Sequence, residues 1–203
     1  NVEKFYLMQR AALDKGGVFA DQFRRLVWTN PELDYTLKRP VNELGKHTWE
    51  DERNFDRDLF LRNFASQLGI FYVYRESCGA CQTFSPIVRN FADRFAVNVK
   101  AISTDGSSNP HFRQVMHDRG QLKSWGVTQQ TPAILVYQSP SIEPRTGKAI
   151  PLVVRGSSGK ELRLRPCAKP QGCLTYVGAG VMSVNEIAER LFVLLATEPG
   201  QDF

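Results

Sequence analysis

Two cysteines, Cys78 and Cys81, are separated only by a glycine and an alanine. Two thiols at this spacing can close into a disulfide and reopen, so the pair can exchange electrons with other thiols. A Cys-x-x-Cys run can also be half of a zinc site. The flanking sequence has to decide between these two chemistries.

The cysteine pair lies where a buried strand gives way to a helix. Residues 70–74 form the short apolar and aromatic run that is typical of a strand. The free N–H groups and the positive dipole end at a helix N-terminus lower the pKa of a thiol there. We therefore expect a redox pair in which Cys78, nearer to solvent, forms the mixed disulfide and the more buried Cys81 resolves it. The apolar positions that recur at helical spacing after the pair are Phe84, Ile87, Val88, Phe91 and Phe95.

A second pair, Cys167 and Cys173, closes the end of a proline-rich segment. A structural disulfide that clips this loop fits the pattern best. A second redox pair that works in relay with the first, free thiols and a metal site are the alternatives. Five intervening residues do not match the usual zinc spacing, and His111 and His117 do not share a helical face, so we expect no metal.

The central stretch of the chain resembles the thioredoxin superfamily. It combines an aromatic strand, the Cys-x-x-Cys run and Pro86, which falls five residues after the second cysteine, where thioredoxins kink the same helix. Residues 125–127, Trp-Gly-Val, followed by Thr131 and Pro132, are similar to the segment that precedes the cis-proline of thioredoxins. The resemblance covers residues 69–195 and is interrupted by an insertion.

The resemblance implies that the peptide bond between Thr131 and Pro132 is cis and that its loop lies against the cysteine pair. The residue before the proline would then offer its N–H and C=O groups to an extended substrate, much like an added strand. We accordingly expect Cys78, Cys81, Thr131 and Pro132 to form the site, without any cofactor. Thioredoxins carry a buried acid where this chain has Tyr72, and threonine before the proline is more typical of periplasmic isomerases. Both features favour disulfide formation or shuffling over thioredoxin-like reduction.

A narrower resemblance extends upstream. Residues 30–42, Asn-Pro-Glu-Leu-Asp-Tyr-Thr-Leu-Lys-Arg-Pro-Val-Asn, then a charged helix and the Phe-Tyr-Val-Tyr-Arg run before the cysteines, resemble the TraF family. This family comprises thioredoxin-like periplasmic proteins of F-type conjugative type IV secretion systems, associated with pilus assembly. The resemblance implies a periplasmic protein whose partners are other transfer or pilus-assembly proteins and whose substrates contain cysteine.

We predict an α/β protein with a thioredoxin-like fold, an N-terminal helical extension and a basic β-hairpin insertion. Residues 1–45 are assigned to the extension and its connector, and residues 46–203 to the thioredoxin-like domain, with the insertion at residues 138–173. Within the insertion, residues 150–155 and 160–165 alternate as two strands of a hairpin.

Several local elements follow from apolar spacing and breakers. We expect two N-terminal helices separated at Gly16 and Gly17, and an extended connector over residues 32–45. Helical spacing resumes over residues 49–68, and residues 112–119 are predicted to form a short helix.

The positive charge of the chain is local. Of the net charge of +5, residues 1–68 contribute nothing, because 11 basic and 11 acidic residues cancel, whereas residues 138–173 hold seven basic and two acidic residues. A solvated loop is the simplest interpretation, and a docking surface for an acidic partner or an anionic membrane is the alternative. Direct nucleic-acid binding is disfavoured because no aromatic side chains are interleaved for base stacking.

The sequence is compatible with two classes of function. The intact pair Cys78 and Cys81 favours a thiol–disulfide oxidoreductase or isomerase that helps transfer proteins to fold, whereas the long extension and the basic hairpin favour a scaffold of the transfer machinery. A cytoplasmic reductant is disfavoured by Cys167 and Cys173. The chain lacks a run of about 18 apolar residues, so we do not expect it to span a membrane. It begins at Asn1 without a recognisable signal segment, which suits a processed or truncated form.

Overall fold

The computed structural model describes residues 1–37, 39–127, 130–143 and 145–198. The described chain divides into two compact units, one formed by Asn1–Asp51 and the other beginning at Glu52. Each unit is considered by itself. The predicted boundary after residue 45 stays a prediction.

The first unit contains the helix α1 (Val2–Thr29), the short 3-10 helix η1 (Tyr35–Leu37) and the first part of α2 (Glu43–Phe64). The predicted break at Gly16 and Gly17 is wrong, because α1 runs through both glycines. A glycine in a helix interior costs only about 1 kcal/mol relative to alanine, which lowers the stability of the helix but does not end it. None of the residues of α1 is buried.

The helix α2 begins six residues before the predicted helix. The side-chain oxygen of Asn42 accepts a hydrogen bond from the N–H of Gly45 (2.7 Å), which satisfies one of the free donors of the first turn. Part of the predicted extended connector is therefore helical. The α-helix ends at Phe64, and a 3-10 turn, η2 (Ala65–Gln67), leads directly into the first strand.

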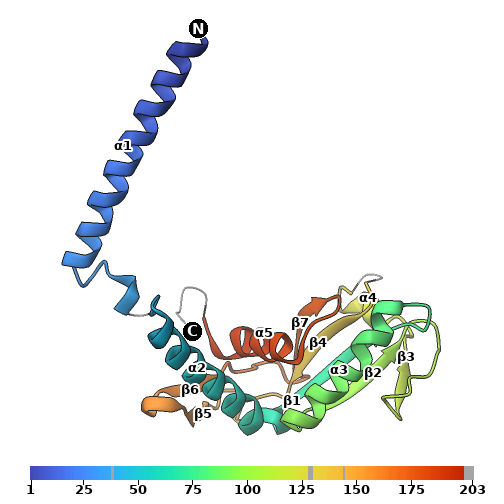
Figure 1. Ribbon diagram of the computed structural model, residues 1–203. Coiled ribbons are helices and arrows are strands. Elements are labelled where there is room, and N and C mark those ends of the chain that lie inside the picture. The colour runs from blue at the N-terminus through green and yellow to red at the C-terminus, as the bar shows by residue number, and fades with distance from the viewer. Residues whose placement is uncertain (38, 128–129, 144, 199–203) are drawn as a thin grey trace. The chain divides into compact units, whose positions relative to one another are not determined.

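The second unit is built on a five-stranded sheet with the order β3-β2-β1-β4-β7 (Figure 1). Its central strand is β1, which pairs in parallel with β2 and antiparallel with β4; β3 extends the parallel side and β7 the antiparallel side. The helix α3 connects the parallel strands β1 and β2. This mixed sheet with its crossover helix is the predicted thioredoxin-like α/β fold. The strands span Leu68–Tyr74 (β1), Asn98–Ser103 (β2), Val115–His117 (β3), Ala133–Gln138 (β4) and Cys173–Ala179 (β7), and the helices span Gly79–Phe95 (α3), Gln121–Ser124 (α4) and Val184–Ala196 (α5).

The predicted helix over residues 112–119 is wrong. This segment contributes β3, whose three residues pair in parallel with Ala101–Ser103 of β2. The apolar residues that suggested a helix, Phe112 and Val115, are instead used separately: Phe112 is buried in the main core and Val115 lies half-buried in the edge strand. Pairing with the free edge of β2 outweighed the short local pattern.

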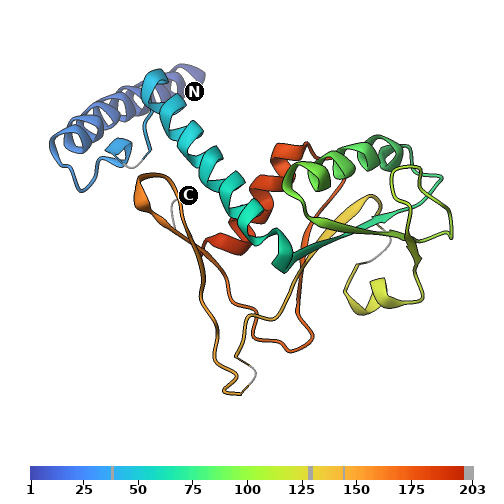
Figure 2. The same cartoon turned by 90° about the horizontal axis from the view of Figure 1, so that it is seen from below.

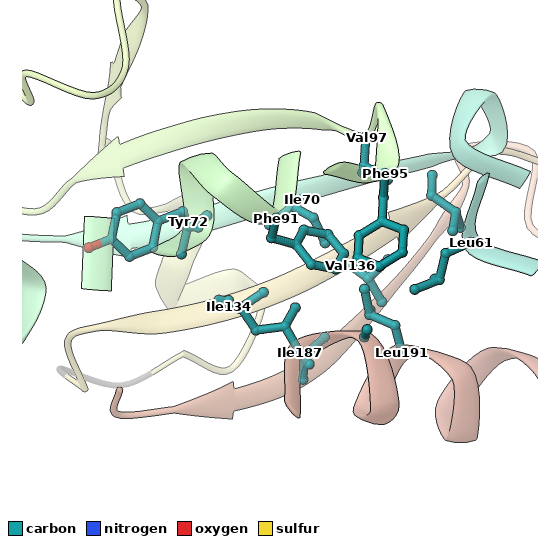
Figure 3. Packing of buried hydrophobic residues seen from close by; sticks show 14 of the residues in the cluster. Leu61, Ile70, Tyr72, Phe91, Phe95, Val97, Ile134, Val136, Ile187 and Leu191 are labelled. Carbon is teal, nitrogen blue, oxygen red and sulfur yellow. The ribbon is translucent and has the colours of Figure 1, made fainter. Parts of the chain in front are cut away.

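Two apolar layers cover the two faces of the sheet. On one face, the residues of α2 from Glu52 onward, α3 and α5 pack on alternate strand residues such as Ile70, Ile134 and Val136 (Figures 1–3). The predicted stripe of α3 is confirmed, because Phe84, Val88, Phe91 and Phe95 are all 0% exposed and Ile87 packs beside them. Each of these large side chains contributes about 1.5–3 kcal/mol by its burial. On the other face, a smaller cluster gathers around Val73, Ile102, Leu122, Val127, Ala133 and Leu135.

The insertion between β4 and β7 contains the predicted hairpin, formed by β5 (Leu152–Arg155) and β6 (Glu161–Leu164) (Figure 2). Its inner side chains Leu162 and Leu164 are buried in the main core. The buried carboxylate of Asp56 on α2 accepts hydrogen bonds from the N–H (2.6 Å) and the hydroxyl (3.0 Å) of Ser157 at the hairpin turn. The hairpin is thus packed on the domain through its apolar face.

The outer face of the hairpin is basic. Arg155, Lys160, Arg163 and Arg165 are exposed there. Glu161 pairs with Arg163, and Glu198 pairs with Arg165, so part of the positive charge is balanced within the chain. Within the described part of the chain, none of the helices combines the length and the apolar character that crossing a membrane requires.

Candidate redox site

Cys78 and Cys81 form a disulfide at the N-terminus of α3. Cys78 occupies the N-cap position, with an extended backbone (φ −104°, ψ 103°), and its Sγ accepts a hydrogen bond from the N–H of Cys81 at 3.1 Å. Because α3 has 17 residues and no acidic residue in its first turn, its positive end is not offset there. In the reduced protein, this position stabilises a thiolate at Cys78.

The two cysteines differ in exposure. Cys78 is 8% exposed and Cys81 is 2% exposed, although both border the main apolar core. An incoming sulfur would reach Cys78 more easily. The predicted division of labour, in which Cys78 forms the mixed disulfide and Cys81 resolves it, agrees with this asymmetry and stays a prediction.

The loop before β4 lies against the cysteine pair. The peptide bond between Thr131 and Pro132 is cis, as predicted, and the carbonyl oxygen of Thr131 lies 3.6 Å from Sγ of Cys78. The carbonyl of Pro132 accepts a hydrogen bond from the N–H of Gly180 (2.9 Å), which joins this loop to the end of β7. The structure therefore brings all four predicted site residues together from two elements far apart in the sequence.

A neutral hydrogen-bond network lies beneath Cys81. The hydroxyl of Tyr72 donates to the carbonyl oxygen of Cys81 (3.0 Å) and lies 2.9 Å from Oγ of Ser85, which donates to the same carbonyl (2.8 Å). The side-chain amide of Asn109 donates to Ser85 (2.9 Å). Tyr72 is 0% exposed, and Figure 3 shows its hydroxyl directed away from the other labelled core residues. Burial raises the pKa of Tyr72 to about 12, so this hydroxyl stays protonated at neutral pH.

Sequence reasoning singled out Tyr72 but missed Ser85 and Asn109. A weak signal for Ser85 exists, because a residue four positions after Cys81 lies above it on the same helix face. Asn109 reaches the site only through the fold of the loop between β2 and β3, and no local pattern indicates that.

The segment before Cys78 is held by Asp105. Its carboxylate accepts hydrogen bonds from the N–H of Glu76 (2.9 Å), from the hydroxyl of Ser103 (2.9 Å) and from both the N–H (3.2 Å) and the hydroxyl (2.6 Å) of Ser107. These donors, led by the Ser107 hydroxyl, hold the pKa of Asp105 well below its usual range. The same loop therefore contacts the chain on both sides of the cysteine pair, at Glu76 through Asp105 and at Ser85 through Asn109.

Two grooves open beside the site. One has a volume of about 620 Å³ and includes Thr131 in its lining, so it borders the cis-proline loop. The other has a volume of about 340 Å³, and its lining includes Cys81, Ser85, Asn109 and His111. The other described residues that line the first groove are Arg75, Thr104, Asp118, Leu122, Lys123 and Val127.

Cys167 and Cys173 form the second disulfide, as predicted, with their Cα atoms 5.7 Å apart. Cys173 pairs with Gln138 at the far end of β4, whereas Pro132 immediately precedes the near end of that strand. Five residues of strand lie between these two positions, which are therefore roughly 20 Å apart along β4. The structure does not bring the two disulfides together, so it offers no direct relay between them.

Metal binding is the alternative to disulfide chemistry for the cysteines. Across the residues that the structure describes, no three His, Cys, Asp or Glu side chains come close enough to hold a metal ion. His111 and His117 are both exposed, and His117 ends the edge strand β3.

The fold and the site define a thioredoxin-like protein that carries a disulfide-bonded Cys-x-x-Cys pair at a helix N-terminus beside a cis-proline. The chain belongs to the TraF family, because the family model described as "TraF: F plasmid transfer operon protein" matches residues 1–192.

Individual proteins also match the chain. It is 25% identical over 153 residues to Protein TraF of Escherichia coli (strain K12), and the match covers 75% of this chain and 59% of that protein. The chain therefore spans less than two thirds of that relative's length. Among solved structures, the crystal structure of StoA from Bacillus subtilis matches 61% of this chain and 81% of its own, with a TM-score of 0.35 and 13% sequence identity.

Proposed function

We propose that this protein is a periplasmic thiol–disulfide oxidase or isomerase of a conjugative type IV secretion system, acting in pilus assembly and DNA transfer. The observation that carries the proposal is the Cys78–Cys81 disulfide at the N-terminus of α3, in contact with the carbonyl of Thr131. The chain belongs to a family whose description is "F plasmid transfer operon protein", which supports the role in transfer.

The proposed oxidation takes two exchange steps. A substrate thiolate attacks Sγ of Cys78, the Cys78–Cys81 bond breaks, and Cys81 leaves as a thiolate that then takes up a proton. A second substrate thiolate attacks the substrate sulfur of this mixed disulfide, which forms the substrate disulfide and releases Cys78 as a thiolate. The substrate loses two electrons and the pair gains them, and a disulfide-bearing donor protein must reoxidise the pair.

The proposed substrates and partners are cysteine-containing proteins of the transfer and pilus-assembly apparatus. An extended substrate segment would pair with the backbone around Thr131, in the groove that this residue borders. The chemistry needs no cofactor, because the sulfur atoms hold the electrons. Residues 46–203 would form the catalytic domain, with residues 138–173 as its insertion and residues 1–45 as an extension.

A scaffold role is the second candidate. It is favoured by α1, on which the large apolar side chains of Phe5, Phe19, Phe23 and Trp28 are each more than half exposed. A helix of this kind gains stability when its apolar side chains are covered. In this alternative, the extension holds other transfer proteins together and the cysteines contribute little.

The two candidates are separated by transfer assays on matched variants. Cys78→Ser removes the sulfur that forms the mixed disulfide and leaves the extension intact, whereas deletion of residues 1–45 leaves the pair intact. The oxidoreductase proposal predicts that Cys78→Ser lowers conjugative transfer and pilus formation. Normal transfer with Cys78→Ser, together with loss of transfer on deletion of the extension, would establish the scaffold instead.

A further inference from the structure

The hydrogen-bonded surroundings of Cys81 contain no charge. Tyr72 and Ser85, 0% and 2% exposed, both donate to the backbone carbonyl of Cys81, and the amide of Asn109 completes the set. None of these three groups takes up a proton at neutral pH, because burial keeps the hydroxyl of Tyr72 protonated to about pH 12 and the others do not titrate.

The other titratable or charged groups around Cys81 lie further out. Tyr74 of β1 is buried, and its pKa is also raised by burial. Arg75, Glu76 and His111 line the same groove as Cys81, but their side chains are exposed to solvent. A proton that leaves Cys81 therefore has no buried base to receive it among the described neighbours, and has to reach the solvent side of the groove.

This arrangement slows the reactions of Cys81 but not those of Cys78. A thiol attacks as its thiolate, and the apolar surroundings of Cys81, which is only 2% exposed, disfavour a charged sulfur at that position. Cys78, at the helix N-terminus, is favoured as a thiolate. The route by which Cys81 loses its proton is also the route by which it regains the proton when it leaves as a thiolate. Opening and closing of the Cys78–Cys81 bond are therefore both slow compared with exchange at Cys78.

We propose that Tyr72 is a positioning residue that makes this site an isomerase of substrate disulfides rather than a carrier of electrons, because it fills the place beneath Cys81 with a side chain that carries no charge. The inference rests on the proposed function and selects isomerisation within it. The thiolate of Cys78 attacks a substrate disulfide, that bond breaks, and one substrate thiolate is released. Another substrate thiolate then attacks the substrate sulfur of the mixed disulfide, which forms a new substrate disulfide and returns the thiolate of Cys78. No net electrons are transferred.

The test follows the two steps separately in the full chain. The reduced protein is mixed with oxidised glutathione and quenched with acid, and mass spectrometry measures the mixed disulfide at Cys78 and its resolution by Cys81. The measurement runs from about pH 5 to pH 9, which brackets the ordinary range of thiol and imidazole titration. For the unmodified protein, we expect the mixed disulfide to accumulate and its resolution to rise with pH through a single inflection.

Two substitutions at the same position provide the contrast. Tyr72→Phe keeps the position neutral and should leave the pH profile of resolution unchanged. Tyr72→Asp places a carboxylate beneath Cys81 and should accelerate resolution about tenfold or more at pH 7, within the range that general bases supply. The rate of mixed-disulfide formation should change less than about threefold, since that step depends on Cys78. If the aspartate variant does not fold, a short-lived mixed disulfide in the unmodified protein, or a resolution rate in Tyr72→Phe that differs from the unmodified rate, would still overturn the inference.

Three results would overturn the inference. Resolution as fast as formation would leave no long-lived mixed disulfide, and equal resolution rates in folded Tyr72→Asp and in the unmodified protein would remove the role of Tyr72. A second inflection near neutral pH that disappears in His111→Ala would show that a groove residue acts as the base. By contrast, a protein that forms no mixed disulfide at all would overturn the proposed function itself, and the inference with it.

Discussion

Removing the second disulfide should lower stability without altering the redox site. The bond between Cys167 and Cys173 closes a loop with a sequence separation of six residues. For a closed loop of about seven residues, the chain-entropy relation gives a loss of about 2.4 kcal/mol at 25 °C. The double variant Cys167→Ala with Cys173→Ala avoids placing a hydroxyl at position 167, which is only 1% exposed.

Guanidinium chloride unfolding, followed by tryptophan fluorescence, measures this loss. With a denaturant dependence of about 5 kcal/mol per molar, the midpoint should fall by about 0.5 M. The single variant Cys173→Ala breaks the same link and keeps the buried sulfur of Cys167, so it separates the loss of the link from the loss of packing. Exchange of Cys78 with glutathione should stay the same in both variants. A changed reduction potential of the first pair, with an unchanged unfolding midpoint, would refute the structural assignment and support a relay.

Two further predictions concern side chains that hold loops in place. Asp56→Ala leaves the N–H of Ser157 without its acceptor and should lower the free energy of unfolding by about 1–3 kcal/mol. Limited proteolysis of this variant should cut first in the hairpin turn. An unchanged unfolding midpoint and an unchanged cleavage pattern would show that Asp56 does not hold the hairpin on the domain. Asp105 has a pKa below its ordinary value of 3.8, so the stability that it contributes is present above that pH and is lost as the pH falls below it toward the folded value. The stability difference between the unmodified protein and Asp105→Asn should therefore be largest near pH 7 and shrink toward pH 2, and a difference that grows on acidification would contradict this account.

The sequence predicts correctly those parts of the fold whose pattern is complete within a short stretch of residues. The apolar stripe of α3 repeats over about three turns, so its buried face can be predicted directly from the sequence. The hairpin could be found because two alternating runs flank a glycine-bounded turn. The contact between Thr131 and Cys78 was expected only from the resemblance, because 53 residues separate the two positions.

The parts of the structure that the sequence did not predict depend on contacts with residues far away in the chain, or on energetic penalties too small to end a helix. Residues 112–119 carry a pattern that fits a helix or a strand, and pairing with β2 decides in favour of β3. The glycines at positions 16 and 17 only lower the stability of a helix and do not forbid it, so α1 continues. Asn109 reaches Ser85 across 24 positions of sequence, through a loop whose course no short motif fixes.

The measurement that tests the central claim most directly is the reduction potential of the Cys78–Cys81 pair. Equilibration with glutathione provides it, with the Cys167→Ala and Cys173→Ala double variant as the control that reports on the first pair alone. An oxidase or isomerase of the periplasm predicts a value of about −120 to −180 mV. A value near about −270 mV would mark a reducing pair and contradict the proposed direction. A pair that never exchanges with glutathione would contradict the redox function and leave the scaffold role.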